Sequence, residues 1–369
     1  MLQSEQGVAP TKKAGGAKPT SQLMSFFGEA PDRVLIVDER GAYLGKTGER
    51  LRVSLNKQTI REVPLFDTEH VLLAAEGISI STDAIGACAE AGIPIDVISS
   101  RGELRACLAA AGLGATVRTR REQLRAYDDV RGGDLARSFA VAKLTNQARL
   151  LRYMAKYRKD LQPDLYTEVG VAAGAVEFEM RSIRALRGPT IDSLRQTILT
   201  HEGRGAARYW GAIGKLLPDE AFVGREGRGA SDPVNSALNY GYTILFSMVQ
   251  RTILLAGLDP FGGFMHVDRP GKPSLVLDMV EEFRQPVVDR CLFALINQGS
   301  TLEAADDGML TLASRREIIR RIEDRLETPD RYDGKRYALR IIMQMQARRL
   351  ASYLRGDAEA YCGFTARFG

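Results

Sequence analysis

The sequence is poor in the residues that build disulfide frameworks, zinc modules and membrane spans. Its four cysteines, Cys88, Cys107, Cys291 and Cys362, are dispersed, and no two have the short spacing of a zinc module. No apolar run is long enough to cross a bilayer, and no charged start precedes the apolar core of a signal peptide. These absences argue against all three classes, and we expect a soluble cytoplasmic protein with no membrane partner.

Charge of one sign and histidine are also limited. The chain has 51 Lys and Arg, 46 Asp and Glu and only three His, which gives a formal net charge of +5. This small excess permits an anionic partner but does not require one. Basic residues gather between Arg101 and Asp160, a pattern that indicates either a basic face for nucleic acid or an ordinary solvated helix surface.

The length of 369 residues and the hydrophobic fraction of 44% predict two domains with a sizeable core. Residues 1–32 are rich in Gly, Ala, Lys and Pro and lack periodic apolar positions, so we expect a disordered tail or linker. Residues 33–103 predict a small β-rich domain, 104–117 an interdomain linker, and 118–369 a larger all-α catalytic domain. The predicted fold class is therefore α+β.

Short β-branched runs separated by turn formers predict the strands of the first domain, at 34–37, 52–55, 60–65, 70–73 and 95–98. Between the last two strands, segment 83–92 has helical spacing and ends at Gly92, a residue suited to a helix stop. The domain is therefore expected to be compact and to contain at least one helix.

Long amphipathic segments dominate the second domain and predict helices, among them 142–157 and 318–326. Asp232 is suited to an N-cap and Pro233 to the first helical position. The stretch that follows, up to Leu255, is apolar nearly all round, which predicts a helix that runs through the core.

A helix over 275–290, kinked at Pro286, places apolar and acidic positions on opposite faces. Clustered carboxylates repel one another unless a cation neutralises them, so the acidic face predicts a hard metal ion if it points inward. If it points outward, it is the solvated face of a surface helix. The residues of this face are Asp278, Glu281, Glu282, Gln285 and Asp289.

Two further residues could complete a metal site. His266 precedes the acidic helix on a segment broken by Pro270, Gly271 and Pro273, which can turn its imidazole toward the carboxylates. It could equally be a hydrogen-bonded structural histidine. Glu202 begins a helical run whose small residues allow another helix to approach closely. Its alternative is an ordinary first-turn glutamate stabilised by the helix dipole.

These residues lie in separate motifs that together resemble the CRISPR-associated adaptation integrase and endonuclease family, whose members insert new spacers into CRISPR arrays. Segment 202–210 reads EGRGAARYW, and His266, Asp278 and Glu281 stand at the family's other site positions. The resemblance includes elements at 231–235, 272–275 and 346–356 and extends from about Arg33 to the last residues. The family often has Arg where Lys272 stands, which keeps the charge but loses a bidentate phosphate contact.

The resemblance implies a metal-dependent DNA endonuclease and integrase. Glu202, His266 and Glu281 would bind Mg²⁺ or Mn²⁺, with Asp278 as the accompanying catalytic acid. Two carboxylates and one imidazole leave open positions on the metal for a phosphate oxygen and an attacking hydroxyl. The 3′-hydroxyl ends of protospacer DNA would then be joined to the repeat boundaries of a CRISPR array. The residues implied to bind DNA or phosphate are Arg269, Lys272 and Arg284, which could also offset the carboxylates themselves, together with Arg208, Asn235 and Tyr242, which would support the site residues or position the DNA.

The resemblance also implies partners. The β-rich domain would mediate homodimer formation and would dock the small ferredoxin-like companion protein of the adaptation complex, and double-stranded DNA would be the substrate. Two other functions stay open: a DNA-binding scaffold with a structural metal site, and a stand-alone nuclease of branched DNA. Catalytic zinc usually has more His or Cys ligands, so magnesium or manganese fits better. Whether Glu282 replaces or assists Glu281 is also open.

Overall fold

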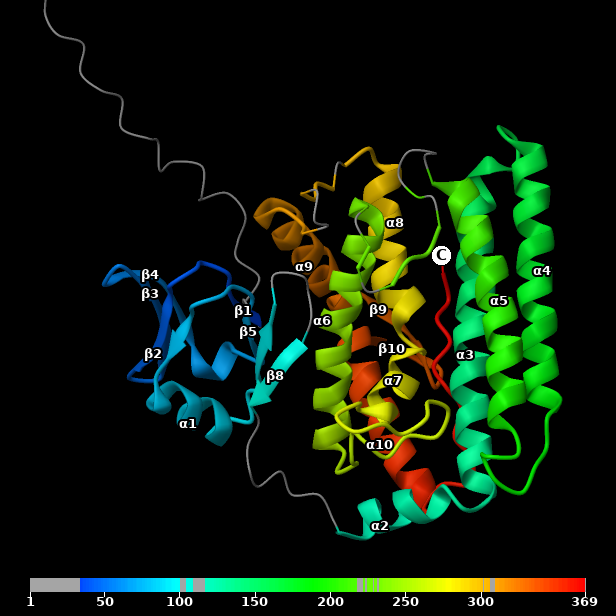
Figure 1. Cartoon of the computed structure of the whole chain (residues 1–369), viewed down its shortest axis with the longest axis horizontal. Helices are drawn as coiled ribbons and strands as arrows, with labels where there is room; N and C mark the ends of the chain where they lie inside the picture. Colours follow the sequence, from blue (N-terminus) through cyan, green and yellow to red (C-terminus); the bar gives the residue numbers. More distant parts are fainter. Residues whose placement is uncertain are drawn as a thin grey trace, which may run out of the picture.

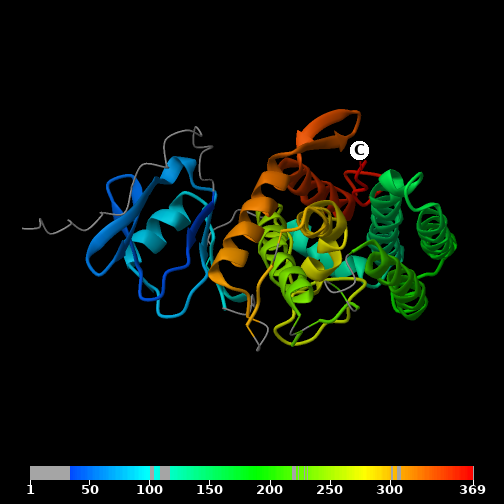
Figure 2. The same ribbon diagram turned by 90° about the horizontal axis from the view of Figure 1, so that it is seen from above.

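The computed structural model describes residues 34–99, 104–108, 117–217, 222, 224–227, 229–230, 232–300, 302–305 and 309–368. The predicted tail, 1–32, and part of the predicted linker, 109–116, lie outside these residues. A strand-rich part, 34–108, lies beside a larger helical part in both Figure 1 and Figure 2. The predicted α+β class, with the β-rich part first, is confirmed.

The strand-rich part contains two four-stranded sheets. The first has the order β1 (Val34–Val37), β5 (His70–Leu73), β7 (Ile95–Ile98) and β8 (Leu104–Leu108), and only β8 is antiparallel to its neighbour. The second has the order β4 (Gln58–Pro64), β3 (Arg50–Leu55), β2 (Tyr43–Thr47) and β6 (Ser79–Ile80). Both sheets and helix α1 (Thr82–Glu90) bury residues in one hydrophobic cluster.

The five predicted strands and the helix that ends before Gly92 are confirmed, but the predicted linker is wrong at its start. Leu104–Leu108 is strand β8, which pairs with β7 at the edge of the first sheet. Its sequence, LRACL, lacks a clear alternation of apolar and polar residues. Pairing with the neighbouring strand, rather than a local pattern, therefore makes this segment a strand.

The first sheet has apolar side chains on both faces. Leu35 and Val37 of β1 belong to the cluster inside the strand-rich part, whereas Val34 of β1 and Leu72 of β5 belong to the core of the helical part. Successive side chains of a strand point to opposite faces, so a strand covered on both sides reads as a continuous apolar run. This sheet therefore attaches the strand-rich part to the helices.

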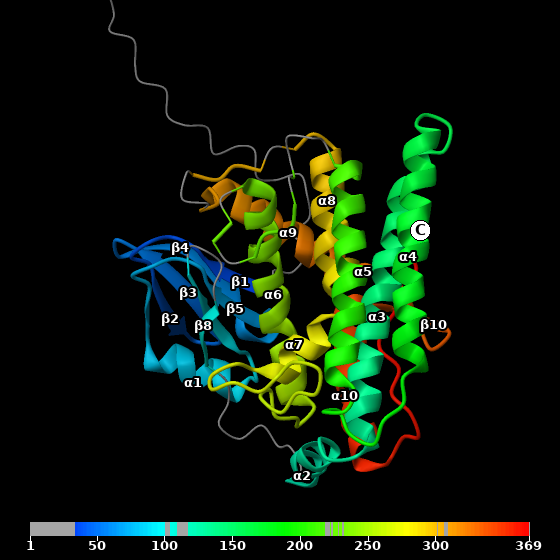
Figure 3. The same ribbon diagram turned by 45° about the vertical axis from the view of Figure 1, so that its right-hand side comes forward.

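The helical part runs from α2 to α10. Its α-helices are α2 (Val117–Ala126), α3 (Val130–Ala155), α4 (Pro163–Ala185), α5 (Arg195–Leu216), α6 (Pro233–Leu255), α7 (Ser274–Val280), α8 (Arg290–Asn297), α9 (Leu312–Glu327) and α10 (Leu339–Arg355). Short 3-10 helices cover Leu65–Asp67 and Lys156–Arg158. Helices α3, α4 and α5 lie side by side at the edge far from the sheets (Figures 1 and 3). A hairpin of β9 (Pro329–Tyr332) and β10 (Lys335–Ala338) was not predicted in the helical part.

Helix α6 is the predicted core helix. The Asp232 side chain accepts a hydrogen bond from the backbone N–H of Asn235, as an N-cap does, and Pro233 is the first helical residue. The helix lies beside the strand-rich part, with α8, α5 and α3 farther from it (Figure 3). Within the described ranges, neither this helix nor any other is both long and apolar enough to span a membrane.

The predicted helix over 275–290 is interrupted earlier than expected. Helix α7 ends at Val280, a turn follows, and Arg284–Asp289 forms a π-helix, η4, before α8 begins. Pro286 has no N–H to donate and its ring crowds the preceding turn, so the regular ladder of α-helical hydrogen bonds is interrupted at this position. The interruption changes the directions in which successive acidic side chains point, and π-helical turns are frequent at functional sites.

Candidate active site

Two of the predicted metal ligands face each other across a lysine. The ammonium of Lys143, on α3, lies 2.6 Å from Glu202 Oε1 and 2.7 Å from Glu281 Oε2. Glu202 is on α5, about two turns after its start, so it is not a first-turn glutamate. The guanidinium of Arg284 lies 3.3 Å from the other oxygen of Glu281. Residues from α3, α5 and the end of α7 thus form one charged cluster.

Burial and charge act in opposite directions on this cluster. Burial would raise the pKa of Glu281, but the positive charges of Arg284 and Lys143 outweigh it and lower this pKa to about 2. Burial would lower the pKa of Lys143, but the carboxylates of Glu281 and Glu202 outweigh it and raise this pKa. The carboxylate of Glu281 and the ammonium of Lys143 are therefore charged together near neutral pH.

His266 is held by Asp278, the other acidic residue of the motif. Asp278 is fully buried, and its Oδ1 lies 2.7 Å from His266 Nδ1. The same carboxylate accepts hydrogen bonds from the backbone N–H groups of Phe264, Met265 and His266. A carboxylate with four donors has no free position for a metal, whereas Nε2 of a neutral His266 remains available. Asp278 therefore orients the imidazole, as carboxylates do beside histidine ligands.

The loop that carries His266 depends on a glycine. A Cβ atom on Gly263 would lie 2.5 Å from the backbone carbonyl carbon of Ser274, at the start of α7. The Gly263 N–H donates to Ser274 Oγ at 2.9 Å. Only a residue without a side chain lets this loop lie so close to the helix, and this closeness brings the backbone N–H groups to Asp278.

The remaining acidic side chains of the predicted face point elsewhere. Glu282 accepts hydrogen bonds from Gln346 Nε2, Tyr361 Oη and the Phe364 N–H, and so ties the C-terminal segment to the core. Burial outweighs these three donors and raises the pKa of Glu282 to about 7. Asp289 accepts from the hydroxyls of Tyr209 and Tyr242. The structure therefore separates Glu281 from Glu282, and only Glu281 faces Glu202.

Of the two readings of the acidic face, the solvated surface is wrong and the metal reading is narrowed to Glu281. The face is not a solvated surface, because its carboxylates are buried. Asp278, Glu282 and Asp289 have separate hydrogen-bond partners, so the face does not converge as a whole on one metal position. In the part of the chain that the structure describes, no three His, Cys, Asp or Glu side chains are grouped so as to hold a metal. The ligand set of Glu202, His266 and Glu281 stays a prediction, with Lys143 between two of its members.

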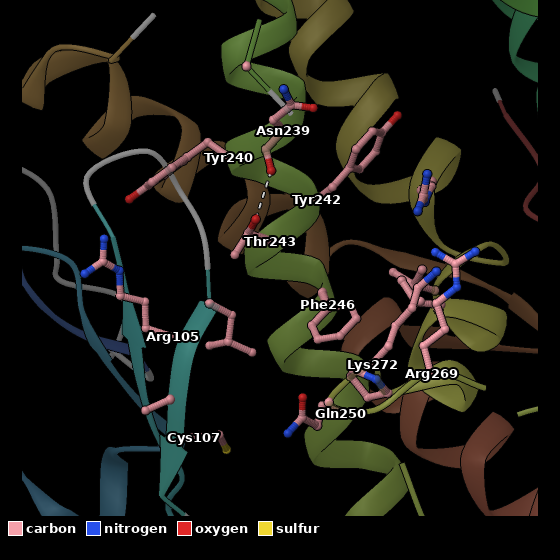
Figure 4. Close-up of a pocket in the computed structure, with 18 of the residues that line it drawn as sticks. Arg105, Cys107, Asn239, Tyr240, Tyr242, Thr243, Phe246, Gln250, Arg269 and Lys272 are labelled. Carbon is pink, nitrogen blue, oxygen red and sulfur yellow. Dashed lines mark hydrogen bonds between the residues drawn. The ribbon is translucent and has the colours of Figure 1, made fainter. Parts of the chain in front are cut away.

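A cavity of about 1170 Å³ lies beside this cluster, between the strand-rich part and α6. Figure 4 shows Arg105 of β8 on one side and Tyr242 of α6 with Arg269 and Lys272 on the other. Arg284, which contacts Glu281, also lines the cavity and so connects it to the carboxylates. The basic side chains of the lining are Arg105, Arg225, Arg269, Lys272 and Arg284, and none of the lining residues that the structure describes is acidic.

The residues predicted to bind or position DNA lie in different places. Arg269, Lys272 and Arg284 line the cavity, whereas Arg208 is exposed on α5 and does not. For Asn235 the geometry suits a supporting role behind the site better than direct contact: the side chain is buried, and its amide is fully used by Arg225, Glu226, Gly224 and Asp232. A satisfied amide has no donor left for a phosphate.

The Tyr242 ring contacts two arginine side chains, and its hydroxyl is already hydrogen-bonded. Its hydroxyl donates to Asp289, and its ring lies 4.8 Å from the guanidinium carbon of Arg284 and 5.5 Å from that of Arg225. An aromatic face attracts such cations. Tyr242 therefore holds two of the arginines that line the cavity.

Sequence reasoning missed Lys143 and Arg225. Lys143 was only one of many basic residues between Arg101 and Asp160. A local signal exists: Lys143 stands with Asn146 and Gln147 in a stretch of α3 that is otherwise mostly apolar and buried. Polar residues in such a stretch must have buried partners. The identity of those partners is decided by α5 and α7, which are distant in the sequence.

The comparisons with known proteins agree on one family. The family model described as CRISPR associated protein Cas1 matches residues 35–324. CRISPR-associated endonuclease Cas1 1 of Archaeoglobus fulgidus is 35% identical over 346 residues, covering 90% of this chain and 99% of that protein. CRISPR-associated endonuclease Cas1 of Korarchaeum cryptofilum is 33% identical over 331 residues, covering 88% and 95%.

Solved structures share the fold. A casposase bound to integration product matches with a TM-score of 0.75 at 21% identity, covering 89% of this chain and 92% of that chain. A Cas1 protein from Thermotoga maritima matches with a TM-score of 0.72 at 18% identity, covering 89% and 98%. The extent of the family match and the identity to these relatives establish that this chain belongs to the CRISPR-associated Cas1 family.

Proposed function

We propose that this chain is a metal-dependent DNA integrase and endonuclease of CRISPR adaptation. Its relatives in the family are named CRISPR-associated endonucleases, and the casposase of similar fold is bound to an integration product. One observation carries the proposal: Glu202, Glu281 and His266 come from motifs of the family, and the cavity beside Glu281 has five basic residues and no acid among the lining residues that the structure describes. Such a cavity suits the phosphates of DNA.

The donor chemistry fits a hard divalent metal. Carboxylate oxygens and one imidazole nitrogen are ligands that Mg²⁺ or Mn²⁺ accepts. The two carboxylates already converge on one positive charge, the ammonium of Lys143. Glu202, Glu281 and Nε2 of His266 would hold the metal. When bound, it would stabilise charge on the phosphoryl group and align the displacement.

The other residues of the site would bind and orient DNA. Arg284 is fixed between Glu281 and the ring of Tyr242, so its guanidinium can meet a phosphate without losing its orientation. Arg269 and Lys272, on the loop between His266 and α7, would neutralise the next phosphates. Asp278 keeps the imidazole of His266 in place through Nδ1.

The reaction would need no protein nucleophile. In strand transfer, the 3′-hydroxyl oxygen of the incoming DNA forms a bond to the target phosphorus while the bond to the leaving 3′-oxygen breaks. The attacking hydroxyl gives up its proton, and the leaving oxygen takes one up. With water in place of the 3′-hydroxyl, the same displacement is hydrolysis, which would be the endonuclease activity.

The partners also belong to the proposal. We infer a homodimer formed through the strand-rich part and a complex with the small ferredoxin-like companion. The complex with a companion is supported by a Cas6-RT-Cas1–Cas2 complex, in which one chain matches with a TM-score of 0.72 at 19% identity, covering 91% of this chain and 36% of that chain. DNA would be the substrate, and the scaffold and stand-alone nuclease hypotheses are the alternatives.

The test is strand transfer of a labelled 3′-hydroxyl DNA fragment into a repeat-containing duplex, with Mg²⁺, Mn²⁺ or EDTA and with or without the companion. Glu202→Gln and His266→Ala should each lower the yield by about 100-fold or more while DNA binding persists. His201→Ala is the matched control, because His201 is next to Glu202 but pairs with Glu179.

The alternatives predict other outcomes. DNA binding with no metal-dependent joining or cutting in the wild type would favour the scaffold. Cutting of branched DNA that needs neither the companion nor a repeat would favour a stand-alone nuclease. Equal loss of activity in His201→Ala and His266→Ala would mean that the assay reports folding rather than the site.

A further inference from the structure

Lys143 is the one basic residue that contacts both predicted carboxylate ligands among the described residues. Only 11% of its side chain is exposed, and its ammonium lies within 2.7 Å of oxygens from both Glu202 and Glu281. Arg284, by comparison, contacts Glu281 alone. The lysine therefore occupies the position between α5 and the end of α7 where a cation shared by both carboxylates must lie.

The buried carboxylate of Glu281 and the partly buried carboxylate of Glu202 need such a cation. Without a positive charge between them, like charges in a poorly solvated site repel, so the side chains separate or one takes up a proton. Lys143 compensates both at once and so keeps Glu202 and Glu281 facing each other. Removal of one partner from a buried charge cluster is costly, because it leaves the others uncompensated.

A lysine can also leave this position without movement of the backbone. Its ammonium is a compact charge on a flexible four-carbon stem, unlike the planar guanidinium of arginine. A divalent metal bound to the same oxygens would repel the ammonium at this distance. The lysine and the metal therefore cannot both keep their contacts with Glu202 and Glu281.

We propose that Lys143 is a positioning residue that holds Glu202 and Glu281 together in the metal-free protein and is displaced when a divalent metal binds. This inference rests on the proposed function, because it requires the metal site. It makes the affinity for the metal a balance between two cations that compete for one pair of carboxylates. The lysine both prepares the site and weakens metal binding.

The experiment measures Mn²⁺ affinity of the full chain by electron paramagnetic resonance and thermal unfolding with EDTA. Lys143→Met keeps the length of the stem but removes the competing charge. We expect Mn²⁺ to bind about tenfold or more tightly, equivalent to about 1.4 kcal/mol per tenfold, and the metal-free protein to unfold at a lower temperature. Excess Mn²⁺ should recover more of the thermal stability in Lys143→Met than in the wild type.

Two other variants separate this role from general packing. Lys143→Arg keeps a positive charge, so it should preserve metal-free stability and should not bind Mn²⁺ more tightly than the wild type. Lys215→Met is the matched control, because Lys215 also pairs with a glutamate, Glu168, but both side chains are about half exposed. This variant should leave Mn²⁺ affinity unchanged.

The outcomes are distinct. Equal or weaker Mn²⁺ binding by a folded Lys143→Met, with wild-type binding intact, overturns the competition and leaves the proposed function standing. Absence of Mn²⁺ binding in the wild type and in every variant overturns the metal site itself, and with it the proposed function. If Lys143→Met does not fold even with Mn²⁺, Lys143→Gln decides, because it removes the charge but keeps a donor: affinity no higher than that of the wild type overturns the inference.

Discussion

Replacement of Asp278 by asparagine tests how much the carboxylate contributes to the site and to the fold. The Asp278 Oδ2 atom accepts from the N–H groups of Phe264 and Met265, at 2.6 and 3.0 Å. Its Oδ1 atom lies 2.9 Å from the His266 N–H and 2.7 Å from His266 Nδ1. All four partners are donors to a carboxylate that is fully buried.

An asparagine must place its NH₂ group against two of these donors, whichever way the amide turns. Hydrogen bonds to charged groups contribute about 1.5–3 kcal/mol each, so two lost bonds lower the free energy of unfolding by about 3–6 kcal/mol. His266 also loses the partner that fixes its ring. Loss of such a partner typically lowers metal affinity or activity by about 10–100-fold.

The assay is urea unfolding followed by the fluorescence of the single tryptophan, Trp210, together with the cleavage assay in Mn²⁺. Asp268→Asn is the control: it lies on the same loop but is exposed, and it has one hydrogen-bond partner, Ser274 Oγ. That variant should cost less than about 1.5 kcal/mol. An Asp278→Asn protein as stable and as active as the wild type would refute the anchoring role of Asp278.

Three further predictions concern stability. Folding raises the pKa of Glu282 from its ordinary 4.5 to about 7, so the folded state binds more protons between these values and the free energy of unfolding falls by about 3 kcal/mol as pH rises through them. Urea unfolding at pH 5 and pH 8 should show a smaller decrease in this free energy for Glu282→Gln than for the wild type, and equal decreases would contradict the assignment. Arg340 of α10 connects Glu69 of the strand-rich part to Glu323 and Glu327 of α9, so Arg340→Ala should lower the free energy of unfolding by about 3 kcal/mol and speed proteolysis between the two parts. Arg320→Ala, which removes exposed ion pairs of α9, should lower it by less than about 1 kcal/mol, and similar losses in the two variants would mean that the connection is unimportant. A Cβ on Gly205 would lie 2.6 Å from Leu144 Cδ2, so Gly205→Ala should lower the free energy of unfolding by about 1–3 kcal/mol and with it the thermal midpoint. A Cβ on Gly203 meets no atom within 4 Å, so Gly203→Ala should raise the midpoint, and the reverse order would refute close packing of α3 and α5.

Several features follow from the sequence because their causes are local. Strand β1 reads as an apolar β-branched run, Asp232 and Pro233 begin α6, and Gly92 follows α1 with a positive φ of 68°. Each depends on the preferences of a few adjacent residues. Motif residues such as Glu202 and His266 were likewise found from patterns in the sequence.

Other features depend on contacts between distant segments. Strand β8 exists because β7 lies beside it, and the directions of Glu281 and Glu282 depend on the π-helical turn and on the partners that meet each carboxylate. The Asn235 amide is of a type that can bind DNA, but its hydrogen bonds go to the backbone of Glu226 and Gly224 in the preceding loop. Residue type alone could not distinguish these cases.

The sequence by itself determined the two-part organisation, most strands and helices, and the acidic and histidine residues of the candidate site. The tertiary structure alone decided that Lys143 lies between Glu202 and Glu281 and that Asp278 holds His266. The physical reason is that propensities and caps act over a few residues, whereas charge compensation of a buried carboxylate depends on which side chains the fold brings within about 3 Å of it.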